Sequence, residues 1–334
     1  MQGHETVLVT GGSGFIGGWC VIRLLQQGYT VRTTVRRLAH EHSVRAAFGK
    51  LIDVQDRLSF HAAELTSDAG WEVATSGCDF VLHVASPVVL SQPRNPNELI
   101  APARDGTRRV VDAAIKSGVR RVVLTSSVAA ASRNAKTVET VSDETVWTDL
   151  SDAKVSAYAR SKTLAECMAW HLIASSGGAT TLVAVNPSVV LGPVLSGDYS
   201  ASVQVVERLL SGKIPGIPRL GFNVVDVRDV ADLHICAMTA PEAAGQRFIA
   251  PGPSAGWRIS RSSCAPASAM RPTRFRRVGF RTLLFGWRPS STRSCEQRYR
   301  ALARSAISRR RRRKACSAGE RVRWRKPCST APGA

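Results

Sequence analysis

The sequence predicts an α/β protein built on a doubly wound parallel sheet. Short apolar runs rich in β-branched residues alternate along the chain with segments of helical periodicity, several of which end at glycine. Strands separated by helices form right-handed crossovers, which make the strands parallel and cover both faces of the sheet. The chain has 334 residues, of which 44% are hydrophobic, so it can bury a sizeable core.

The first strand is expected at Thr6–Thr10, where TVLVT stops at a run of glycines. A helix is expected at Phe15–Gly28, because its apolar residues recur at helical spacing and Gly28 can serve as its C′ residue. The later elements repeat this alternation. They are strands at Tyr29–Val35, Asp79–Ala85, Arg120–Ser127 and Thr180–Ser188, and a helix at Gly106–Gly118.

The glycine-rich turn VTGGSGFIGG joins the first strand to the first helix and predicts a dinucleotide site of the Rossmann type. Gly11, Gly14 and Gly17 allow a tight turn, a close approach of the pyrophosphate to the backbone, and close packing of the helix on the strand. The helix N-terminus, with Phe15 and Ile16, offers free N–H groups and a positive dipole end to the phosphates. The alternative is that glycines have this spacing by chance.

The end of the second strand favours NADP over NAD. Many dinucleotide sites carry an acidic residue about 20 residues past the glycines, which holds the ribose 2′-hydroxyl. Here the strand ends TTVRR, so Arg36 and Arg37 occupy this region without an adjacent acid. An arginine suits a 2′-phosphate, and the alternative is a pair of solvated loop arginines.

Candidate catalytic residues lie in SAYARSKTLAE and VVLTSS. Tyr158 and Lys162 are four residues apart, so on a helix they share one face. A lysine ammonium beside a phenol lowers the phenol's pKa, which would let the tyrosine act as a general acid or base near neutral pH. Ser126 and Ser127 end a strand at the edge where parallel sheets bind ligands. Taken singly, these motifs also fit a structural pair and ordinary strand-end capping.

Six motifs, in this order, resemble the extended short-chain dehydrogenase/reductases, also described as the NAD-dependent epimerase/dehydratase family. They are VTGGSGFIGG, VLHVASP, VVLTSS, YARSK, VNPSVVLGP and VVDVRDVADLH. The resemblance covers about residues 5–259 and is strongest to the dihydroflavonol 4-reductase-like branch. It implies NADP-dependent reduction of an aldehyde or ketone by hydride transfer. The alternatives are a nucleotide-sugar epimerase or dehydratase of the same superfamily and a non-enzymatic dinucleotide-binding protein.

The resemblance also implies roles for individual residues. Tyr158 is the acid/base, Lys162 binds the nicotinamide ribose and tunes Tyr158, and Ser127 polarises the substrate carbonyl. The remaining cofactor contacts that it implies are Glu64, Leu65, Val84, Ala85, Pro187 and Ser188.

Two features of the sequence limit how far the roles of family residues apply to this chain. His83 lies on a cofactor-facing strand end, and as a lone histidine it is expected to be structural. The plant flavonoid enzymes carry an asparagine shortly after the catalytic serine, whereas this chain has Ser132 and then Asn134 in a different register. A flavonoid substrate is therefore not expected.

The basic charge of the chain is confined to its last 75 residues. The formal net charge is +21, yet residues 1–259 hold 25 Lys+Arg against 23 Asp+Glu. Residues 260–334 hold 21 Lys+Arg against 2 Asp+Glu. We therefore expect nucleic acid to bind at most non-specifically, through this tail.

Residues 260–334 are expected to be an out-of-frame, disordered tail, and residues 1–259 the dinucleotide-binding domain with part of a small C-terminal substrate subdomain. The tail lacks helical and strand periodicity, and its 19 Arg against 2 Lys are typical of a GC-rich gene read in the wrong frame. Read one frame over, Cys316–Ala334 permits LLGWRARPVEEALLDSARS, which resembles the C-terminal helix of the family. The alternatives are a genuine basic arm and an unrelated domain.

Neither a membrane association nor a metal site is expected. The chain has no apolar run near the ~18 residues of a membrane span. The four cysteines before residue 260 include no CxxC pair of the kind that holds a metal. These observations favour a cytoplasmic protein whose partner is a small carbonyl substrate, and they make no prediction of oligomeric state.

Overall fold

The structure is a computed structural model that describes residues 5–88, 93–132, 142–195, 200–211, 221–252 and 254–256. The expectations for Asn134 and for the basic tail fall outside these described residues.

A seven-stranded parallel sheet forms the centre of the fold, in the order β3-β2-β1-β4-β5-β6-β9. The order reverses between β1 and β4, and ligands bind at the carboxyl ends of the strands beside such a switch point. The predicted doubly wound parallel sheet is confirmed. Its strands are β1 Thr6–Thr10, β2 Thr30–Val35, β3 Leu58–Ala62, β4 Phe80–His83, β5 Arg121–Thr125, β6 Thr181–Pro187 and β9 Arg247–Ala250.

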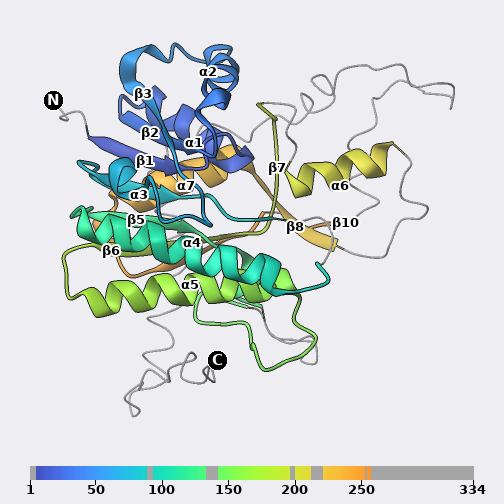
Figure 1. Ribbon diagram of the computed structural model, residues 1–334. Helices are drawn as coiled ribbons and strands as arrows, with labels where there is room; N and C mark the ends of the chain where they lie inside the picture. The colour runs from blue at the N-terminus through green and yellow to red at the C-terminus, as the bar shows by residue number, and fades with distance from the viewer. Residues whose placement is uncertain are drawn as a thin grey trace, which may run out of the picture.

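Helices cover both faces of the sheet, as Figure 1 shows. The helices α1 (Phe15–Gln26) and α7 (Val227–Thr239) pack on one face, and α3 (Trp71–Thr75), α4 (Asn97–Lys116) and α5 (Ala157–Ser176) pack on the other. The alternation within β1 explains this, because Val7 and Val9 belong to the first core and Leu8 to the second. All three side chains are fully buried, as a doubly covered sheet requires.

A second sheet lies outside the central one, in the order β10-β8-β7. Its strands are β7 Val189–Leu191, β8 Gly221–Asp226 and β10 Ser254–Gly256. Because β7 follows β6 after a single residue, this sheet stands at the carboxyl edge of the central sheet, near α6 (Figure 1). The other helical segments are α2 Glu41–Gly49, α6 Ala201–Leu210, and the short η1 Leu38–His40, η2 Gln55–Arg57, η3 Val128–Ala130 and η4 Pro241–Ala243.

The expected element boundaries hold within two residues except at α4. The expected start at Gly106 was wrong, because α4 begins at Asn97 and includes both Pro102 and Gly106. Gly106 is required inside the helix by packing, since a Cβ there would lie 2.7 Å from side-chain atoms of Leu65. No helix in the described part of the chain is both long and apolar enough to cross a membrane.

Candidate active site

The glycine loop has the tight geometry that its sequence predicts. Gly11 adopts φ +69°, and the Gly14 amide donates to the Gly11 carbonyl oxygen at 2.9 Å. A Cβ on Gly17 would lie 2.3 Å from that same oxygen. No side chain of the described residues caps α1, and its first turn carries no acidic residue. The exposed amide end and uncompensated dipole fit a pyrophosphate, with Phe15 and Ile16 in the first turn.

The turn after β4 is held against the end of β1, where the glycine loop begins, by hydrogen bonds to Thr10. The Thr10 hydroxyl accepts from the Val84 and Ala85 amides at 3.0 Å each, so it donates its own proton to Nδ1 of His83 at 2.9 Å. His83 is therefore protonated at Nε2, which donates to the Thr107 hydroxyl at 3.3 Å. Burial lowers the pKa of His83 to about 3, so the ring is neutral. His83 is structural, as expected.

The residues expected on the adenosine side lie at the ends of β2 and β3. Arg36 and Arg37 follow β2 and are exposed, and among the described residues neither forms an ion pair. Glu64 is exposed just after β3, while Leu65 packs on Gly106 of α4. The free guanidinium of Arg36 at this edge fits a 2′-phosphate.

The structure brings the predicted catalytic trio together at the carboxyl end of β5. Ser127 directly precedes η3, and its Oγ accepts from the Ala129 amide at 3.2 Å. Tyr158 stands in the first turn of α5, whose N-terminus is capped by the Ser156 hydroxyl. Ser127 and Tyr158 share a side-chain hydrogen bond. Lys162, one turn along α5, donates from Nζ to the Thr125 carbonyl at 3.1 Å.

The pKa of Tyr158 shifts in the direction opposite to the one expected. Burial raises this pKa, and the hydrogen bond with Ser127 opposes the rise only in part. The expectation was wrong because the Lys162 ammonium hydrogen-bonds the Thr125 carbonyl, and burial dominates at the phenol. A raised pKa keeps the phenol protonated at neutral pH, which suits a proton donor.

Pro187 and Ser188 lie at the carboxyl end of β6, beside the trio. Pro187 is buried, and the Asn186 amide nitrogen just before it donates to the Ser127 carbonyl at 3.0 Å. Oγ of Ser188 is buried and finds no hydrogen-bond partner within the described structure. A buried hydroxyl without a partner is rare, so this one fits a polar group of a bound ligand.

Sequence reasoning missed a buried set of polar residues behind the trio, namely Glu166, Asn186 and Arg247. Glu166 follows Lys162 by four residues, so helical spacing alone could have placed it on the same face. Arg247 carried no signal, because its pairing with Glu166 spans 81 residues of chain.

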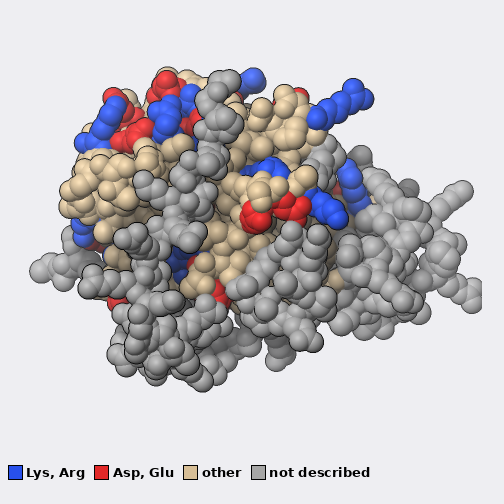
Figure 2. All heavy atoms as spheres, turned by 90° about the horizontal axis from the view of Figure 1, so that it is seen from below, with Lys and Arg blue, Asp and Glu red and all other residues tan. Residues whose placement is uncertain are grey.

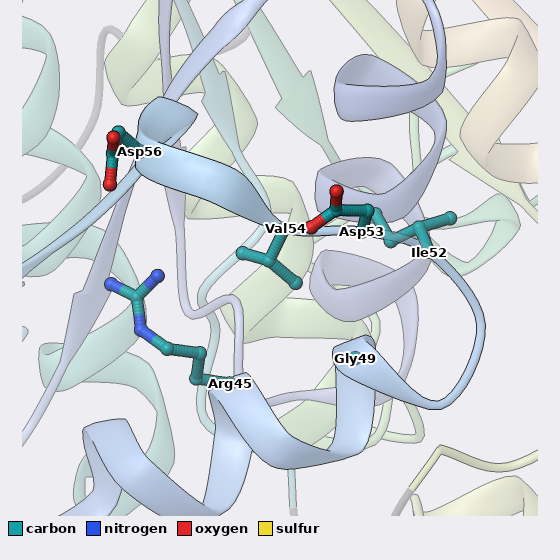
Figure 3. Close-up of a pocket in the computed structure, with 6 residues that line it drawn as sticks. All are labelled: Arg45, Gly49, Ile52, Asp53, Val54 and Asp56. Carbon is teal, nitrogen blue, oxygen red and sulfur yellow. The ribbon is translucent and has the colours of Figure 1, made fainter.

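A hollow on the surface lies apart from this site, between α2 and η2 (Figure 3). Its lining includes none of the predicted site residues, so it is not the dinucleotide site. In the described residues no cluster of His, Cys, Asp and Glu could hold a metal. The hollow is lined by Arg45, Gly49, Ile52, Asp53, Val54 and Asp56.

Comparisons with known proteins identify relatives of this chain. Residues 7–249 match the model of the NAD dependent epimerase/dehydratase family. Cinnamoyl-CoA reductase 2 of Arabidopsis thaliana is 37% identical over 249 residues, covering 74% of this chain and 73% of that protein. An anthocyanidin reductase of Vitis vinifera is 34% identical over 261 residues, covering 73% and 75%. The structure of Gre2 from Candida albicans in complex with NADPH has a TM-score of 0.69 and 28% identity, covering 78% and 81%.

Proposed function

The chain belongs to the NAD dependent epimerase/dehydratase family, and we propose that it reduces an aldehyde or ketone with NADPH. The observation that carries the proposal is the meeting of Ser127, Tyr158 and Lys162 at the carboxyl end of β5. The names of its relatives support this reaction, since those compared above are reductases and one is bound to NADPH.

In this proposal NADPH, when bound, supplies the hydride, and the protein supplies orientation and proton transfer. The Ser127 hydroxyl and the Tyr158 phenol donate hydrogen bonds to the substrate carbonyl oxygen. Tyr158 then gives its proton to the alkoxide that develops on that oxygen. The Lys162 ammonium, one turn away on α5 and hydrogen-bonded to the Thr125 carbonyl, binds the ribose hydroxyls of the cofactor.

The backbone and the strand ends position the cofactor. The N-terminus of α1 with Gly11, Gly14 and Gly17 receives the pyrophosphate, and Arg36 receives the 2′-phosphate. Val84 and Ala85, fixed by Thr10, line the cofactor from β4. Glu64, Leu65, Pro187 and Ser188 complete the proposed contacts.

Replacing Arg36 by Asp is expected to shift cofactor preference from NADP toward NAD. The carboxylate repels a 2′-phosphate and accepts hydrogen bonds from a 2′-hydroxyl. Fluorescence titrations measure the dissociation constants for NADPH and NADH. The dissociation constant for NADH divided by that for NADPH is expected to fall. The matched control is Arg32→Asp, because Arg32 lies on β2 with its guanidinium bound to the Ser76 carbonyl instead. An unchanged ratio in Arg36→Asp would place the 2′-phosphate contact elsewhere.

We also propose that residues 260–334 come from a slipped reading frame. The family match ends at residue 249, and the alignments with the two curated relatives above leave about a quarter of each relative unmatched. This supports the loss of part of the substrate subdomain. In this proposal the positive charge of residues 260–334 plays no part in the function of residues 1–259. On the face shown in Figure 2, the described residues carry acidic and basic side chains interspersed. We propose in addition that the protein is cytoplasmic and that it contacts nucleic acid only through the tail.

Restoring the frame after Ser260 tests both proposals. The restored protein is expected to gain melting temperature and NADPH-dependent reduction of a panel of aliphatic and aromatic aldehydes and ketones. Limited proteolysis of the protein with its basic tail is expected to leave a core that ends near Ser260, because the tail has too few apolar residues to offset the entropy of ordering. A protease-resistant tail would contradict the frame proposal, and loss of NADPH consumption in both proteins would contradict the function.

A further inference from the structure

Glu166 is a fully buried charge directly behind the proposed catalytic residues. Its side chain is 0% exposed, and its carboxylate faces the guanidinium of Arg247, which is 7% exposed. Nε of Arg247 donates to Oε1 at 2.6 Å, and a second guanidinium nitrogen donates to Oε2 at 3.3 Å. A buried charge is costly unless it is paired and fully hydrogen-bonded, so this pair needs an explanation beyond stability.

The carboxylate of Glu166 joins the strands that carry the site. Its Oε2 accepts from the Ser126 hydroxyl at 2.5 Å and from the Asn186 amide at 2.9 Å. The same Asn186 amide nitrogen donates to the Ser127 carbonyl at 3.0 Å. The backbone of Ser127 is therefore held in two ways. Its neighbour Ser126 is bound to Glu166, and its own carbonyl accepts from Asn186, which also binds Glu166.

Arg247 extends this arrangement to the segments around the site. Its guanidinium donates to the Val146 carbonyl at 2.6 Å and to the Ala130 carbonyl at 3.3 Å, and it stacks on the Trp147 ring at 3.9 Å. Ala130 ends η3, which begins just after Ser127, and residues 146 and 147 lie in the segment that leads into α5. One guanidinium thus connects η3, which follows the serine, and the segment that leads into α5 to the helix that carries the tyrosine.

Glu166 also acts on Lys162, which lies one turn earlier on α5. Burial lowers the pKa of Lys162 to about 8, and the charge of Glu166 opposes that shift. A lysine in this position is charged below that pH and loses its proton as the pH rises through it. Without Glu166, the loss is expected at lower pH, closer to neutrality.

The other ionisable groups near Lys162 do not supply this charge. His83 on β4 and His234 on α7, which accepts from the Thr125 hydroxyl, have pKa values lowered by burial to about 3 and about 4, so both are neutral. Tyr158 on α5 has a raised pKa and is also neutral. Arg247 on β9 carries a positive charge in its pair with Glu166, so it supplies no negative charge to the ammonium.

We propose that Glu166 and Arg247 are positioning residues for the reduction, which together fix the Ser127 backbone and keep the Lys162 ammonium charged in its place. This inference rests on the catalytic roles proposed above. Glu166 touches no reacting atom, and it acts through Ser126, Asn186 and Lys162. The charge of Glu166 is what the role requires, since a neutral side chain of the same shape would keep the packing and lose the effect on the ammonium.

The test uses the full chain with Glu166→Gln, followed by carbon-13 NMR of labelled lysine Cε atoms, in which Lys162→Arg identifies the Lys162 resonance. The titration midpoint of Lys162 is expected to fall by about one pH unit. The kcat for an aldehyde substrate is expected to fall roughly tenfold to hundredfold, because a smaller fraction of Lys162 is charged and because Ser126 and Arg247 lose the charged partner that they bind. The matched control is Glu72→Gln, which removes an exposed carboxylate that pairs with Lys116 and is expected to change neither quantity.

A second variant separates positioning from stability. Glu166→Gln with Arg247→Gln removes both charges, so its melting temperature is expected to exceed that of the single variant while kcat and the Lys162 midpoint stay low. If Glu166→Gln does not fold, the kcat and the Lys162 midpoint of the double variant test the inference instead. A Lys162 midpoint that stays in place, or a kcat that recovers in the double variant, would overturn the inference. If neither this chain nor the frame-restored protein reduces a carbonyl, the proposed function fails, and the Lys162 titration still decides this inference.

Discussion

Replacing Tyr158 by Phe is expected to lower kcat for carbonyl reduction by roughly two to four powers of ten, the usual contribution of a positioned general acid. The substitution removes the phenol that hydrogen-bonds Ser127 and would protonate the alkoxide. The ring keeps its place in the first turn of α5. The measurement is steady-state oxidation of NADPH by the frame-restored protein at saturating concentrations of the aldehyde that it reduces fastest.

Two controls accompany this variant. Its melting temperature is expected to stay close to that of the parent, because only an oxygen atom is removed and the packing of the ring is retained. Its dissociation constant for NADPH is expected to change little, since Tyr158 is assigned to the proton and the glycine loop to the phosphates. A kcat within tenfold of the parent's would remove Tyr158 from the role of acid.

Replacing Gly17 by Ala is expected to weaken NADPH binding by roughly tenfold or more, or about 1.4 kcal/mol. The new Cβ would lie 2.3 Å from the Gly11 carbonyl oxygen, a backbone atom that can move only if the whole turn moves. The turn would then open, and the amides at the start of α1 would no longer converge on the pyrophosphate. Fluorescence titration with NADPH measures the effect.

Gly49→Ala is the matched control for this substitution. Gly49 also lies in a helix, α2, but a Cβ there would meet nothing within 4 Å, so NADPH binding is expected to stay unchanged. Equal affinities in Gly17→Ala and Gly49→Ala would show that the cofactor does not use this loop.

The parts of the fold that local sequence determines were predictable. The strand β1, the glycine turn and α1 follow one another in 21 residues, and each has its own signal in spacing or residue type. The start of α4 was not predictable locally, because Gly106 lies inside the helix to admit Leu65 from a distant loop. The strands β7 and β10 have three residues each, too few to show a periodicity, and both pair with β8 from distant parts of the chain.

The site also contains residues that the local sequence predicts and residues that it does not predict. Tyr158 and Lys162 share a helix, so their spacing placed them on one face, and the position of Ser127 followed from the end of β5. The direction of the Tyr158 pKa shift was missed because it depends on burial, which the assembled tertiary structure sets. The pairing of Glu166 with Arg247 joins α5 to β9, and nothing in the local sequence of either element announces it.

Transfer of deuterium from NADPH labelled at C4 of the nicotinamide to a carbonyl substrate tests the central claim most directly. The measurement is mass spectrometry of the alcohol formed by the protein with its basic tail and by the frame-restored protein. One deuterium on the former carbonyl carbon is expected from one of the two hydride positions, together with an equal amount of NADP. If neither protein yields labelled alcohol from the substrate panel, hydride transfer to a carbonyl is not the function of this chain.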